Sequence, residues 1–132
     1  MISVTPRLID TVRGYFVARR DGKAEKYYAD RVDIIKAGLI SDDVNEISES
    51  VREVIFFDLI GYDTSFSEFG ILELMSHNDF SAKLVGYTAS TQIWKADSPV
   101  VLMATNRIQR DLTSTSFHYA DFALSSLSLI HI

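Results

Sequence analysis

Apolar residues in this 132-residue chain recur at spacings of three and four along most of its length. That spacing places apolar side chains on one face of an α-helix. The sequence contains no strand-length run in which apolar and polar residues alternate, as they do in a half-buried β-strand. It also contains only six glycines and two prolines, few enough to leave long helices uninterrupted. The pattern therefore predicts an all-α fold.

Signals for helix starts divide the chain further. Thr5-Pro6 and Ser98-Pro99 each place a capping hydroxyl before a proline, which is favoured at the first helical position. Ser65 followed by Glu68 predicts a capping box, in which each side chain accepts a hydrogen bond from a backbone N–H of the first turn. Asp79 is a further predicted N-cap.

Seven helices are predicted, each with an apolar stripe facing the core. Gly61 directly follows the third stripe, where a left-handed residue would end the helix. In chain order the stripes are Leu8, Val12 and Tyr15 or Phe16; Tyr28, Val32, Ile35 and Leu39; Val44, Ile47, Val51, Val54, Ile55 and Leu59; Phe69, Leu72 and Met75; Leu84, Tyr87 and Thr88; Leu102, Asn106, Ile108 and Leu112; Tyr119, Phe122, Ala123 and Leu127.

The predicted helices repeat. The third, fifth and seventh start near Val44, Phe80 and Phe117, at intervals of 36 and 37 residues. Such intervals are typical of HEAT/armadillo-like helix pairs, which stack into an α-solenoid. Residues 123–132 run apolar to the last residue without a polar capping repeat. We therefore expect residues 1–132 to be an N-terminal fragment of a longer array.

Residues that would carry catalysis are sparse. The chain has no cysteine, and its three histidines show no metal-ligand spacing. Phosphate-binding loops and nucleophile elbows do not occur in it. Asp42, Asp43, Glu46 and Glu49 are interpreted as acidic residues that favour the positive end of a helix dipole rather than as a cation site. We expect neither an enzyme nor a bound metal or cofactor.

Charge is unevenly distributed. Residues 1–39 carry eight basic and five acidic side chains, a balance of +3, whereas residues 40–79 carry one and ten, a balance of −9. These are either solvated helix faces or two faces offered to two different partners. The acidic stretch argues against nucleic-acid binding, while the basic cluster of Arg19, Arg20 and Lys23 suits anionic phospholipid. No stretch approaches the length of a membrane span, so we expect a cytoplasmic protein.

Four blocks of sequence, in one order, resemble the N-terminal trunk of the large adaptin chains of adaptor-protein complexes. The delta chain of the third adaptor complex is the most similar branch, and the gamma and epsilon chains are the nearest alternatives. The blocks are Phe57–Asp63, Ile71–Ser76, Lys83–Tyr87 and Ala104–Leu112, with Thr113–Ser116 after them.

The resemblance implies a non-enzymatic helical-repeat scaffold in a heterotetrameric vesicle coat, without the rest of the trunk, the hinge and the ear. Its partners would be a small sigma, a medium mu and a beta chain, an Arf-type GTPase, and cargo with sorting signals. The implied location is peripheral, on Golgi or endosomal membranes, with transport to the lysosome or vacuole.

The resemblance also implies roles for individual residues. Phe69 and Leu72 match positions that contact the GTPase in the gamma chain, although their spacing alone favours a place in the core. Arg19 matches approximately a residue that helps hold an acidic dileucine signal, and with Arg20 and Lys23 it could instead face phospholipid. The alternative functions are another helical-repeat scaffold, such as a coatomer large chain, and a self-contained helical ligand-binding domain.

Overall fold

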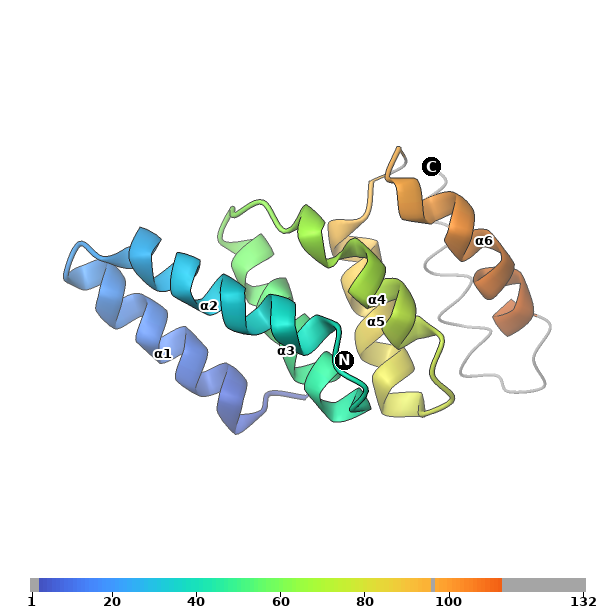
Figure 1. Ribbon diagram of the computed structural model, residues 1–132, viewed down its shortest axis with the longest axis horizontal. Coiled ribbons are helices and arrows are strands. Elements are labelled where there is room, and N and C mark those ends of the chain that lie inside the picture. Colours follow the sequence, from blue (N-terminus) through green and yellow to red (C-terminus); the bar gives the residue numbers. More distant parts are fainter. Residues whose placement is uncertain (1–2, 96, 113–132) are drawn as a thin grey trace.

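A computed structural model describes residues 3–95 and 97–112, which form six α-helices and one short 3₁₀ helix arranged in a row (Figure 1). Within these residues the chain forms no β-strand, as expected for the predicted all-α class. In chain order the elements are α1 (Pro6–Arg20), α2 (Ala24–Leu39), α3 (Val44–Leu59), η1 (Ser65–Ser67), α4 (Glu68–Met75), α5 (Phe80–Ile93) and α6 (Pro99–Leu112).

The helices form two layers. Helix α3 contacts α1 on one side and α5 on the other (Figure 1). Helix α4 packs on α3 and α5 and also contacts α6. Helices α3 and α5 begin at Val44 and Phe80, which confirms the predicted interval of 36 residues. This arrangement is an α-solenoid of helix pairs. The predicted seventh helix, starting near Phe117, lies outside the described residues.

Two predicted N-caps are confirmed. The Thr5 hydroxyl accepts a hydrogen bond from the backbone N–H of Leu8 at 3.3 Å, and α1 begins at the following proline. The Asp79 carboxylate accepts one from the backbone N–H of Ala82 at 3.0 Å and starts α5. Each side chain satisfies a backbone donor that the first helical turn leaves unpaired.

The end of α3 also follows the prediction. Gly61 has a φ of 103°, a conformation that L side chains rarely adopt. The backbone N–H of Tyr62 donates to the carbonyl of Phe57, and that of Gly61 donates to the carbonyl of Asp58, both at 3.1 Å. These two bonds make a Schellman motif, which turns the chain sharply towards η1.

The predicted capping box is wrong. Ser65 opens the 3₁₀ helix η1 instead of capping a helix, and the side chains of the N-cap residues Thr64 and Ser67 make no capping hydrogen bond. The Asp63 carboxylate already accepts a hydrogen bond from the backbone N–H of Ser65, at 3.0 Å. Asp63, two positions before Ser65, therefore supplies the side-chain acceptor that the motif predicted from Ser65 and Glu68.

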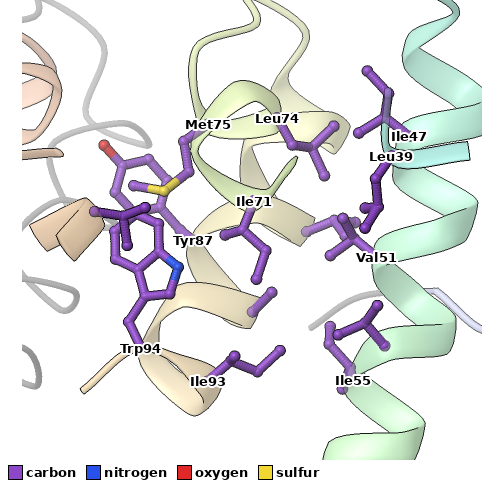
Figure 2. Close-up of a cluster of buried hydrophobic side chains, with 14 of the residues drawn as sticks. Leu39, Ile47, Val51, Ile55, Ile71, Leu74, Met75, Tyr87, Ile93 and Trp94 are labelled. Carbon is purple, nitrogen blue, oxygen red and sulfur yellow. The ribbon is translucent and has the colours of Figure 1, made fainter. Parts of the chain in front are cut away.

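The apolar core lies between α3 on one side and α4 with α5 on the other. Figure 2 shows Val51 and Ile55 of α3 facing Ile71 of α4 across this core. Trp94, at the end of α5, is 5% exposed, as expected for a packing residue. The fully buried side chains also include Ile35, Ile47, Val54, Phe57, Leu74, Met75, Val85 and Val100.

Three residues of the predicted stripes are not in the core. Phe69, Leu59 and Leu102 are 58%, 70% and 82% exposed. In each helix other apolar residues at the same spacing take the buried positions: Phe57 in α3; Ile71, Leu74 and Met75 in α4; Val100, Val101 and Ala104 in α6. Spacing alone cannot choose between two adjacent apolar stripes. The side chains of Asn106, Ile108 and Leu112 lie outside the description.

Helix α3 is buried on almost every side because α1, α2, α4 and α5 all contact it. Every residue from Val51 to Ile55 is less than a tenth exposed, including Arg52 and Glu53. Buried charges are costly unless they are paired and hydrogen-bonded. The contacts of α3 therefore determine how the first helix pair attaches.

Candidate functional site

The Glu53 carboxylate is the meeting point of three helices. Its side chain is fully buried. It accepts hydrogen bonds from Arg7 Nε at 2.9 Å, from the Thr11 hydroxyl at 2.7 Å and from Arg31 Nε at 2.9 Å. The first two donors belong to α1 and the third to α2. Two guanidinium groups and a hydroxyl thus compensate one buried charge.

Arg7 also binds a second carboxylate. Its Nη1 donates to Glu46 at 2.6 Å. Burial opposes the charged form of Arg7, but hydrogen bonds and charges from Glu46 and Glu53 outweigh this effect and raise the pKa of Arg7. Arg7 therefore stays a cation that holds α1 to two carboxylates about two turns apart on α3.

These contacts limit the prediction that the basic and acidic stretches are solvated faces or faces for separate partners, because some of their charges pair with one another. Arg7 and Arg31 from the basic stretch pair with carboxylates of the acidic stretch. Some basic side chains of residues 1–39 and some acidic side chains of residues 40–79 therefore neutralise each other within the fold. Asp43 caps α3 by accepting from the backbone N–H of Asn45 at 3.0 Å, as the dipole interpretation expected.

The segment before α1 is tied to α3 as well. Arg52 Nε donates to the carbonyl of Ser3 at 3.2 Å, and the Thr5 hydroxyl donates to Glu49 at 2.8 Å. The start of α1 is therefore fixed by hydrogen bonds of defined direction rather than by apolar packing.

An aromatic cluster holds the opposite end of the first helix pair. The rings of Tyr28 and Tyr62 stack with centroids 3.9 Å apart, and the Tyr28 hydroxyl donates to the carbonyl of Asp63 at 3.1 Å. The Tyr62 hydroxyl donates to Glu25 at 3.1 Å and lies 3.3 Å from that of Tyr15. Burial, with the bonds to Tyr15 and Glu25, raises the pKa of Tyr62.

The predicted GTPase-contact residues both lie on α4, but they differ in exposure. Phe69 is 58% exposed, whereas Leu72 is half-buried and packs against the core. Helix α4 is anchored through other side chains, since Ile71 and Leu74 are fully buried. Phe69 is therefore available to a partner, and the core interpretation does not apply to it.

The predicted anion-contact residues lie at the turn between α1 and α2, at one end of the row of helices (Figure 1). Arg19, Arg20 and Lys23 are all exposed. The side chain of Arg20 makes one ion pair, with Asp21 at 3.4 Å, and both side chains are at least half exposed. Such pairs contribute little, so the three cations remain available to an anion.

The described residues include no group of three or more His, Asp or Glu side chains arranged to hold a metal ion. None of the described helices is long and apolar enough to cross a membrane. Sequence reasoning missed the cluster around Glu53, because a single polar residue within a helix carries no pattern. The only signal for it was the opposite charge of the first two segments.

The sequence matches the family described as "Adaptin N terminal region" over residues 30–131. It is 34% identical over 121 residues to AP-3 complex subunit delta-1 of Bos taurus, covering 92% of this chain and 10% of that protein. It is 31% identical over 123 residues to AP-3 complex subunit delta of Dictyostelium discoideum, covering 93% and 10%. AP-1 complex subunit gamma-2 of Arabidopsis thaliana is 23% identical over 124 residues, covering 94% and 14%. The chain spans about a tenth of the length of the delta relatives from Bos taurus and Dictyostelium.

We predict that Glu53→Ala lowers the free energy of unfolding by about 3–5 kcal/mol, because it leaves two partly buried guanidinium groups without their partner. Urea denaturation followed by circular dichroism measures this loss. Glu73→Ala, an exposed change on α4, is the matched control and should change stability by less than about 0.5 kcal/mol. Equal stability of the two variants would contradict the central role of Glu53.

Proposed function

The chain belongs to the adaptin N-terminal region family, and from this membership we propose that it is a non-enzymatic subunit of a heterotetrameric vesicle-coat adaptor complex. The family match confirms the resemblance carried by the four sequence blocks. Among the relatives described above, the identity is higher to the AP-3 delta chains than to the AP-1 gamma chain. The proposed place of the chain is therefore that of a delta-type large chain.

In this role residues 1–132 form the first helix pairs of a longer trunk. The complete chain would assemble with a sigma, a mu and a beta chain, bind cytoplasmically to Golgi or endosomal membranes, and sort cargo towards the lysosome or vacuole. The family match over residues 30–131 is the observation that carries this proposal. It favours an adaptor complex over a coatomer chain or a self-contained ligand-binding domain.

Affinity capture tests the proposal directly. The parent chain that contains residues 1–132, tagged and purified from its own cells, should bring down one sigma, one mu and one beta chain in equal amounts. Mass spectrometry of the eluate identifies them. Recovery of coatomer chains instead, or of the parent chain alone, would overturn the assignment.

The exposed Phe69 side chain is the proposed contact for an Arf-type GTPase, with Leu72 beside it on α4. Phe69 is more than half exposed, while the buried residues of α4 hold the helix in place without it. An exposed aromatic ring on a rigid helix is a suitable anchor for a partner, because burying it releases water at little entropic cost.

We predict that Phe69→Asp weakens binding of the GTP-loaded GTPase by about tenfold or more while the helical content stays unchanged. Surface plasmon resonance measures the affinity, and circular dichroism measures the helicity. Leu59→Asp, which changes another exposed apolar residue, is the control and should bind like the wild type. Unfolding by Phe69→Asp, or unchanged GTPase binding, would contradict the proposed contact.

The basic cluster of Arg19, Arg20 and Lys23 is proposed to contact anionic phospholipid. Arg19 and Arg20 end α1, Lys23 directly precedes α2, and all three are exposed at one end of the row of helices, an arrangement that suits a flat charged surface. Each basic residue near such a surface contributes about 1 kcal/mol.

We predict that reversing all three charges to glutamate lowers binding to phosphatidylserine vesicles by about 100-fold, in line with about 3 kcal/mol lost. Vesicle co-sedimentation at low salt measures this loss. The control reverses Arg13, Lys36 and Lys95, which are exposed elsewhere and give the same net charge. Equal losses in both variants would contradict a specific lipid contact. If instead only binding of an acidic dileucine peptide responds to the cluster, the cargo interpretation replaces the lipid one.

A further inference from the structure

Two adjoining cavities run along α2 between the starts of α1 and α3. Their volumes are about 530 and 490 Å³, and both are lined by Ile34 and Glu46. We call the combined depression the α2 groove. Its other lining residues include Arg7, Asp10 and Arg31 at one end and Asp33, Ala37 and Ser41 at the other.

The middle of the α2 groove is apolar. Ile34 lines both cavities, and its side chain is 49% exposed. Helix α2 is anchored in the core by Ile35 and Leu39, so Ile34 is not needed to hold it. A half-exposed isoleucine at the junction of two cavities gains stability when an apolar side chain covers it.

The charge around the α2 groove is negative. Asp10 and Asp33 form no hydrogen bond or ion pair with any residue in the described part of the chain. Arg7 and Arg31 are already engaged by Glu46 and Glu53. Three carboxylates and two guanidinium groups line the groove, and the buried Glu53 behind them raises the excess to two negative charges. A cationic ligand is therefore favoured, and an anionic membrane is disfavoured.

One nitrogen of Arg7, a residue that lines the groove, has no hydrogen-bond partner. Arg7 donates through Nε to Glu53 and through Nη1 to Glu46, but its Nη2 has no partner although it is buried from water. A buried guanidinium N–H without an acceptor costs free energy. Because this nitrogen is screened from solvent, a ligand bound in the groove does not reach it unless the guanidinium moves.

We propose that the α2 groove binds an extended peptide segment in which one apolar side chain stands between two lysines or arginines. The apolar side chain covers Ile34, and the two cationic side chains lie near Asp10 and Asp33. In an extended chain, side chains two positions apart lie on the same face, so a pattern of basic, any, apolar, any, basic presents all three to the groove. This inference does not depend on the proposed GTPase or lipid contacts, which use other residues.

Fluorescence anisotropy with the 132-residue chain tests the proposal. The probe is a fluorescein-labelled peptide in which a leucine stands between two lysines, separated from each by one serine. A second peptide replaces both lysines with glutamate, and a third replaces the leucine with serine. The first peptide should bind at least about tenfold more tightly than either of the others, and its binding should weaken as salt is raised.

Variants of the chain locate the site. Asp10→Asn and Asp33→Asn should each weaken binding of the first peptide by about threefold to fivefold, and the two together by about tenfold. Ile34→Ser should weaken it by a similar factor, and circular dichroism verifies that each variant keeps its helices. Asp97→Asn, an exposed change in the loop before α6, is the matched control and should bind like the wild type.

Three outcomes would overturn the inference. The first is equal binding of the lysine and glutamate peptides. The second is unchanged affinity in the combined variant of Asp10 and Asp33. The third is a change of sedimentation coefficient in the unliganded groove variants, because it would mean that a second copy of this chain occupies the groove. Each outcome can occur whether or not the chain assembles into an adaptor complex.

Discussion

The buried carboxylate of Glu53 is the constraint on which the first part of this structure depends. A carboxylate removed from water needs several hydrogen bonds, and here it obtains them from α1 and α2 at once. Helix α3 can therefore be enclosed only when both earlier helices bring their donors to the same point. The bonds are directional, so they specify how α1 and α2 are rotated as well as where they lie.

The rest of the solenoid is held differently. Between α3, α4 and α5 the contact is mainly apolar, with Val51, Ile71 and Leu74 fully buried. A few hydrogen bonds add to it, such as those from the Gln92 side chain of α5 to the Ile55 carbonyl and the Asp58 carboxylate of α3. Helix α1, by contrast, buries only Thr11 and Tyr15. Its attachment relies on the ion pairs at one end and the aromatic cluster at the other. Polar contacts at α1 thus determine which of its side chains stay exposed, and the position of the α1–α2 turn follows from them.

Local sequence signals predicted much of this architecture, and their failures have physical causes. The hydroxyl before Pro6 and the left-handed Gly61 mark helix ends because their chemistry acts within a few residues. Phe69 was placed in the core by spacing because α4 is apolar on two adjacent faces. Its exposure is decided by which face meets α3 and α5, and no local pattern contains that information. Glu53 went unnoticed for a related reason, since its partners lie 22 to 46 residues away.

Two of the proposed contact surfaces share helices α1 and α2, whereas the third lies on α4, and this division affects how they would act together. The basic turn belongs to α1 and α2, the α2 groove faces the starts of α1 and α3, and Phe69 lies on α4. Helix α3 contacts each of these helices and is itself almost completely enclosed. A ligand at the basic turn or the groove would influence Phe69 through α3, and a shift of α3 would break the bonds to Glu53. Because that shift is costly, the free energy of binding at Phe69 should be nearly additive with that at either surface of the first helix pair. The solenoid then acts as a rigid spacer that presents several contacts at fixed positions.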